Sequence, residues 1–351
     1  MKKNTKKQII NISFVILLLV LMISILTKST DELNFSNLKK FFSSANILYL
    51  ILAFVCWGLF ILFESLSLHI ILRKMGYKPK IKSSIAYTTA DVYYSAITPS
   101  ATGGQPASAF YMIRDGVDGG TAGFTLIFNL VGYTAAILII GLFALLFGFD
   151  TFLLLPGFVK LLIIIGFFLQ IFLLTFFIIC MCYHEFVRKV GYWLVNTLSK
   201  IKIIRKRDKW INRVDNVVEK YGSCYDEFKE NKLTLIPVIV CNTLQRAFQV
   251  LISAFVCKAA INVDISEIFI LQSLVLLGYN SIPLPGGAGA YEYLYLKVFG
   301  LYFPEAFIVI AMMVTRTISY YFSLVISGIY TIIYHLFKRK RNVIVGGVVY
   351  E

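Results

Sequence analysis

The sequence is poor in charged residues, which make up only 15% of its 351 positions. A soluble globular domain usually carries about a quarter. Hydrophobic residues instead make up 58%, and the mean hydropathy is +0.76. The shortage of charge excludes an ordinary soluble protein and favours a single helical bundle in a membrane.

Catalytic and metal-binding motifs are lacking as well. The sequence contains no GxGxxG, GxxxxGK[ST], HExxH or GxSxG pattern. Its six cysteines form no CxxC pair, and its three histidines all lie near predicted membrane edges. We therefore expect no metal site and no cofactor. The hydrophilic loop 183–232 is too short for a catalytic domain of its own.

Charge of one sign dominates, because 34 Lys and Arg residues face 19 Asp and Glu residues. The net charge of +15 allows a nucleic-acid partner as an alternative. However, the basic residues gather in loops beside apolar runs, where the positive-inside rule already places them. We expect no nucleic-acid partner, and a secondary attraction to anionic lipid headgroups.

Six apolar segments are long enough to cross a bilayer, which takes about 20 residues. The first follows a lysine-rich start and resembles a signal peptide, but no small-x-small cleavage site ends it, which favours an uncleaved helix. The predicted crossings are Ile9–Leu26, Ile47–Leu72, Gly120–Phe147, Phe158–Tyr183, Leu233–Ala260 and Pro304–Phe337.

Two further apolar segments, Ser83–Ile113 and Ser266–Gly300, are each broken halfway by prolines and glycines. Proline removes an amide donor, and glycine permits backbone geometry that other residues avoid, so neither segment forms one continuous helix. The alternative is a packing-tolerated kink, but two matching breaks favour two helical hairpins inside the bundle. The breaking residues are Pro99, Gly103, Gly104 and Pro106, then Pro283, Pro285, Gly286, Gly287 and Gly289.

The order crossing, broken hairpin, crossing occurs twice, and the charge of the loops orients it. If the two hairpins are re-entrant from opposite sides, placing the basic loops in the cytoplasm also places both termini there. Eight simple crossings would put both termini in the cytoplasm as well. The sequence predicts an all-α polytopic membrane bundle with two inverted repeats, each containing a broken re-entrant helical hairpin. The predicted units are 1–46, repeat 1 at 47–147, 148–232, repeat 2 at 233–337 and a basic tail at 338–351.

Five charged residues fall at predicted membrane depth: Glu64, Asp91, Arg246, Glu292 and Arg316. Such charges are costly and usually face the bundle interior or a polar cavity. Arginine offers a planar fork for phosphate or carboxylate, so these residues are candidates for binding an anionic substrate. The alternative is buried Arg–Glu pairs that only fix packing.

Residues at both breaks carry a family resemblance. The run from Ser281 to Glu292 is similar to the PxPGGxGxxE signature of the lysylphosphatidylglycerol synthase transmembrane region, also called the flippase-like or UPF0104 family. Thr98–Pro106 resembles the TPxxTGGxP segment of its Gram-positive members. The resemblance covers about Ile47 to Phe337 and implies the flippase half of the multiple peptide resistance factor proteins.

That resemblance implies a bacterial cell-membrane protein that moves anionic or aminoacylated phosphatidylglycerol to the outer leaflet and so resists cationic peptides. The chain ends at Glu351, so we expect the synthase domain to be missing and the protein not to be an enzyme itself. The family name would instead imply a phosphatidylglycerol lysyltransferase. A membrane subunit that needs a separate synthase is a further alternative, and a homo-oligomer is left open.

Overall fold

The computed structural model describes residues 35–98, 101–200, 207–280, 282, 287 and 289–342. Within these ranges the regular structure is entirely helical, which confirms the predicted all-α class. The predicted first crossing, Ile9–Leu26, lies outside the described residues.

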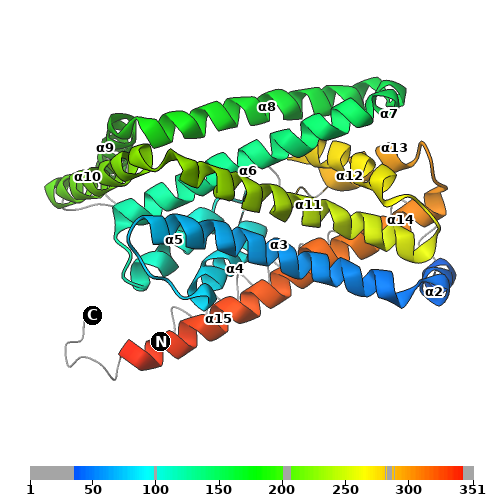
Figure 1. The fold of residues 1–351 in the computed structure, drawn as a ribbon, viewed down its shortest axis with the longest axis horizontal. Coiled ribbons are helices and arrows are strands. Elements are labelled where there is room, and N and C mark those ends of the chain that lie inside the picture. Colours follow the sequence, from blue (N-terminus) through cyan, green and yellow to red (C-terminus); the bar gives the residue numbers. More distant parts are fainter. Residues whose placement is uncertain are drawn as a thin grey trace.

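Five helical stretches are long and apolar enough to span a membrane; in Figure 1 the last of them, drawn in orange and red, slants across the others. Each matches a predicted crossing to within a few residues, because long uncharged runs leave few other places for a helix to end. The spans are α3 (Ile47–Lys74), α6 (Gly119–Phe147), α8 (Gly157–Cys182), α11 (Leu235–Ala260) with the short turn Lys232–Thr234, and Glu305–Phe337.

Both broken segments are pairs of helices rather than continuous rods. The first pair is α4 (Ile81–Ile97) with α5 (Gly104–Arg114), and the second is α12 (Ile265–Tyr279) with α13 (Ala290–Phe299). In each pair the two helices pack against each other, and the pairs lie toward opposite ends of the molecule in Figure 1. The break chemistry was therefore interpreted correctly, whereas re-entry and inversion of the repeats stay predictions.

The last span has an interruption that the sequence did not indicate. Its first helix, α14 (Glu305–Arg316), runs into a π-helical turn at Thr317–Phe322 before α15 (Ser323–Asn342) continues. Isolated π turns inside α-helices are rare and frequently occur at functional sites. This turn directly follows Arg316, one of the predicted membrane-depth charges.

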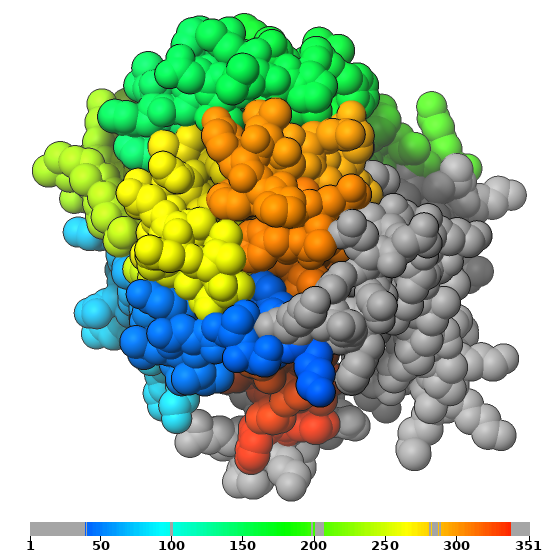
Figure 2. Space-filling model, turned by 90° about the vertical axis from the view of Figure 1, so that its right-hand side faces the viewer, coloured from blue at the N-terminus to red at the C-terminus, as the bar shows by residue number. Residues whose placement is uncertain are grey.

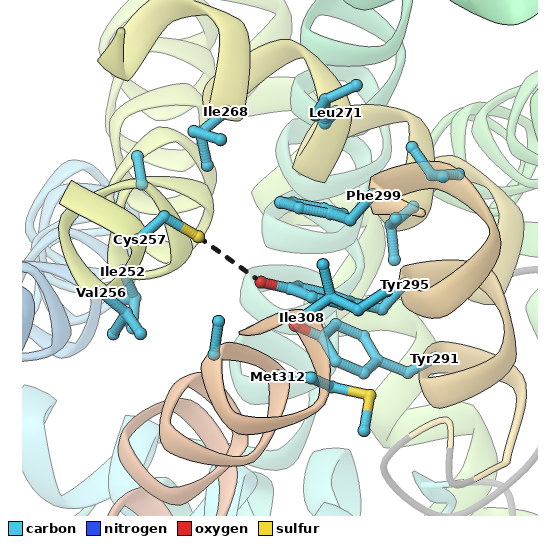
Figure 3. Packing of buried hydrophobic residues seen from close by; sticks show 14 of the residues in the cluster. Ile252, Val256, Cys257, Ile268, Leu271, Tyr291, Tyr295, Phe299, Ile308 and Met312 are labelled. Atoms are coloured by element: carbon cyan, nitrogen blue, oxygen red, sulfur yellow. Dashed lines mark hydrogen bonds between the residues drawn. The ribbon is translucent and has the colours of Figure 1, made fainter. Parts of the chain in front are cut away.

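The largest core cluster joins α11, α12, α13 and α14 (Figure 3). Tyr295 is fully buried there, and its ring stacks on Phe299 with centroids 3.9 Å apart. Its hydroxyl lies 3.2 Å from Ser253 Oγ and 3.7 Å from Cys257 Sγ, so the polar end of the ring has partners. Burying a tyrosine costs little when its hydroxyl is satisfied in this way.

Side-chain hydrogen bonds tie α3, α6 and α11 together. Ser67 Oγ donates to Asn129 Oδ1 over 2.5 Å, and Asn242 Nδ2 donates to Ser67 Oγ over 3.0 Å. All three residues are buried. Polar contacts of this kind stabilise helix pairs in lipid, where little hydrophobic force acts between helices.

Shorter helices cover the ends of the spans. The helices α2 (Phe35–Ser44), α7 (Phe149–Leu154) and α13 lie at the right-hand end of Figure 1. Figure 2 shows the molecule from that end. At the other end of Figure 1 the predicted hydrophilic loop holds α9 (His184–Lys200) and α10 (Arg207–Glu230).

Candidate functional site

A cavity of about 220 Å³ lies between the two broken helix pairs. Ser95 of α4 and Ala101 of the first break line it from one side, and Gln272, Asn280 and Tyr291 line it from the second pair. The spans α3, α6, α11 and Glu305–Phe337 supply the rest of the wall. Residues of both broken segments therefore line one cavity.

Both predicted arginines line this cavity, although each is only 7% exposed. Arg246 comes from α11, and Arg316 ends α14 immediately before the π turn. Further polar groups that lack hydrogen-bond partners within the described chain surround them: Gln272 Oε1, Thr315 Oγ1 and Ser323 Oγ. These atoms offer hydrogen-bonding positions to a polar ligand or water, because buried polar atoms are nearly always satisfied.

The charge of Arg316 is balanced by a carboxylate within the predicted repeat 2. Its Nε donates to Glu292 Oε1 over 2.8 Å, and the rings of Tyr291 and Tyr320 lie 4.3 and 5.3 Å from the guanidinium carbon. Glu292 Oε2 also accepts from the Gly289 amide over 2.6 Å, which caps α13. The Glu292 carboxylate therefore both pairs with Arg316 and caps the start of α13, which is the arrangement of a group that positions its neighbours.

Arg246 differs from Arg316 because no ion pair to it occurs among the described residues. Its guanidinium hydrogen-bonds to Gln249 and lies 4.0 Å from the centroid of the Tyr133 ring. Its Nε has no hydrogen-bond partner in the described structure. A buried arginine with aromatic and amide neighbours retains hydrogen-bond donors for an anion.

The acidic candidates lie beside the cavity and are absent from its lining. Glu64 Oε2 accepts from Gln245 Nε2 over 2.8 Å, and the charges of Asp91 and Arg246 are near enough to act on it. Asp91 accepts from Ser95 over 3.1 Å and from Gln105 over 2.9 Å. Glu64 and Asp91 therefore lie behind the residues that line the cavity, as Glu292 does, and their part in substrate binding stays a prediction.

The first break is held by a side-chain hydrogen-bond relay. Thr98 Oγ1 donates to the Tyr94 carbonyl over 2.6 Å and accepts from the Gly103 amide over 2.8 Å. Gly104 packs so closely that an added Cβ would lie 1.9 Å from Asp91 Oδ1. Pro106 lies in the first turn of α5, where its missing amide costs no helical bond.

At the second break, Gly287 and Gly289 have φ values of +66° and +83°, a region that glycine occupies without strain. Gly289 directly precedes α13, so its conformation sets the start of the helix that carries Glu292. The remaining predicted breaking residues, Pro99, Pro283, Pro285 and Gly286, lie outside the described residues.

Several site residues were missed from the sequence. Gln272 and Asn280 are uncharged polar residues inside an apolar segment, a signal that was available but weaker than charge. Tyr133 and Tyr291 carry no such signal, because an aromatic residue in a membrane helix is usually core or lipid-facing. Within the described ranges, no group of three or more His, Cys, Asp or Glu side chains is placed to hold a metal ion.

Five long apolar helices, four of which line a charged cavity, define a multi-pass membrane protein with a polar site inside the bundle. The chain belongs to the lysylphosphatidylglycerol synthase transmembrane region family, whose profile matches residues 8–327. It is also similar to a UPF0104 membrane protein of Archaeoglobus fulgidus, with 32% identity over 113 residues. That match covers 32% of this chain and 33% of the relative.

Proposed function

We propose that the protein moves an anionic phospholipid, phosphatidylglycerol or its aminoacylated form, between the leaflets of the bacterial cell membrane through this cavity. The observation that carries the proposal is Arg246, a buried cation at the cavity wall without an ion pair in the described chain. Both lipids share the phosphodiester group, which an arginine fork binds.

The charge distribution supports an anionic rather than a cationic headgroup. Arg316 is already balanced by Glu292, so an anion beside Arg246 compensates the arginine that has no ion pair within the described ranges. A charge at membrane depth is costly, and a ligand phosphate offsets that cost while it is bound. The rings of Tyr133 and Phe60 line the same cavity, and their centroids lie 4.0 and 5.8 Å from the guanidinium carbon of Arg246.

Movement of the headgroup requires the cavity to open alternately to either leaflet. The two breaks are the expected joints, since discontinuous helices around a central site are typical of transporters with alternating access. The basic α9–α10 region and both termini are placed on the cytoplasmic side in this proposal, because cytoplasmic loops are rich in Lys and Arg.

The test is lipid redistribution in liposomes that contain the purified protein and fluorescent phosphatidylglycerol. Arg246→Gln is expected to slow redistribution by about 10- to 100-fold, since a charged hydrogen bond contributes about 1.5–3 kcal/mol. Arg213→Gln is the matched control, because Arg213 is exposed on α10 and stacks over Trp210 away from the cavity.

Wild-type rates in Arg246→Gln would contradict the proposed role of the cavity. Transfer of lysine from charged tRNA to phosphatidylglycerol by this chain alone would favour the lysyltransferase alternative instead. A protein that neither moves nor converts the lipid without an added soluble synthase would point to the membrane-subunit alternative.

A further inference from the structure

One face of α9 carries large apolar side chains that nothing in the described structure covers. Phe186, Val190, Trp193 and Leu194 are all exposed, with Trp193 64% exposed. Their spacing of four, three and one residues places them on a single side of a helix with 3.6 residues per turn. We refer to these four residues as the α9 stripe.

The opposite side of α9 is fixed against α10. The Tyr192 hydroxyl donates to Asp215 Oδ1 over 2.5 Å, and Arg188 Nε lies 3.6 Å from the same oxygen. Gly191 lets Val214 approach so closely that an added Cβ would lie 2.7 Å from its methyl group. Because these contacts set the rotation of α9, the stripe is held outward by packing.

The α9 stripe continues the lipid-facing side of α8. Only Tyr183 separates the two helices, and the ring of Phe186 meets that of Phe176 edge-on with centroids 6.2 Å apart. Phe176 in turn stacks on Phe172, and both are exposed on the apolar span. In Figure 1, α9 lies at the end of α8 and turns away from its axis.

Two exposed lysines border the stripe. Lys189 and Lys200 are eleven residues apart, about three turns, so they project from the same side of α9. Neither makes an ion pair within the described ranges. Lysine stems lie along apolar surface while their ammonium groups reach polar surroundings, which suits a membrane interface.

We propose that α9 is an interfacial helix whose stripe inserts among the acyl chains just below an anionic lipid surface, with Lys189 and Lys200 contacting headgroup phosphates. Continuity with the lipid-facing side of α8 fixes the depth of the stripe, and the two lysines supply complementary charge. This surface is separate from the cavity, so it does not depend on which lipid the protein moves.

The test uses Trp193 as a depth probe in the full-length protein. The chain has three tryptophans, so replacing Trp57 and Trp210 by phenylalanine leaves Trp193 alone. In vesicles of phosphatidylcholine and phosphatidylglycerol, bromines near the headgroup end of the acyl chains are expected to quench Trp193 more than bromines near the chain ends. Aqueous acrylamide is expected to quench it weakly.

Trp210 is the matched control, because it is 43% exposed on α10 and lies off the stripe. A protein that retains only Trp210 is expected to show the reverse pattern, with strong acrylamide quenching and weak bromolipid quenching. Should the Trp57 replacement fail to fold, the difference between wild type and Trp193→Phe gives the same comparison.

Acrylamide quenching of Trp193 equal to that of Trp210 would overturn the proposal. Protection from acrylamide without bromolipid quenching would also overturn it, because it would mean that protein covers the stripe. The double variant Lys189→Gln/Lys200→Gln is expected to lose the extra bromolipid quenching that phosphatidylglycerol gives over pure phosphatidylcholine, whereas Lys209→Gln on α10 retains it. An unchanged double variant would remove the lysines from the proposal.

Discussion

Replacing Arg316 by methionine is expected to lower the free energy of unfolding by about 3–5 kcal/mol, because it leaves the Glu292 carboxylate buried without its cation. Glu292→Gln is expected to cost a similar amount for the converse reason. The pair is close, with 2.8 Å between Arg316 Nε and Glu292 Oε1, and both side chains are largely buried. Equilibrium unfolding in mixed micelles measures the change.

The double variant Arg316→Met/Glu292→Gln separates pairing from packing. Because it removes both charges together, its loss of stability is expected to be smaller than the sum of the two single losses. Strictly additive losses would contradict an interaction between the two side chains. In the liposome assay both single variants are also expected to lose transport, and wild-type transport in both would remove the pair from the site.

Gly104→Ala is expected to push α5 away from α4 and to destabilise the protein by about 1–3 kcal/mol through overpacking. The added Cβ would lie 1.9 Å from Asp91 Oδ1, 2.0 Å from Ser95 Oγ and 2.8 Å from the Asp91 carbonyl oxygen. The first two atoms can rotate away, but the carbonyl belongs to the α4 backbone. Thermal unfolding in detergent, followed by tryptophan fluorescence, reports the loss.

Gly58→Ala is the matched control, since nothing lies within 4 Å of its added Cβ on the long helix α3. It is expected to be neutral or slightly stabilising, because alanine is the better helix former. Equal destabilisation by the two substitutions would show that close packing at Gly104 is not the cause.

The two cavity arginines are equally buried and carry the same charge, but their contacts differ. Arg316 is held by Glu292, a residue that also caps α13, so its charge is committed to the architecture of the predicted repeat 2. Arg246 hydrogen-bonds to the Gln249 amide and lies over the Tyr133 and Phe60 rings, and it makes no ion pair among the described residues. The proposed function therefore depends on Arg246 more than on Arg316, which the sequence treated alike.

Much of the fold was predictable, because the local amino-acid composition is enough to identify a membrane helix. Apolar runs of sufficient length marked α3, α6, α8, α11 and the last span, and the Pro/Gly clusters marked both helix pairs. The π turn at Thr317–Phe322 was not predictable, because its residues Thr-Ile-Ser-Tyr-Tyr-Phe suit an ordinary helix equally well. The six-residue break before Gly104 was located, but its Thr98 relay required coordinates.

The sequence by itself determined that the chain is a helical membrane bundle with two interrupted segments and five charges at membrane depth. Hydropathy and helix-breaking residues act over short stretches of sequence, so their effect can be predicted without knowing which helices pack together. Only the tertiary structure decided that Glu292 pairs with Arg316 and that Glu64 and Asp91 lie behind the cavity lining. It also placed Arg246 at the cavity with no ion pair to any residue that the structure describes. Those choices depend on which helix faces come together, and packing between residues as distant as Glu64 and Gln245 fixes them.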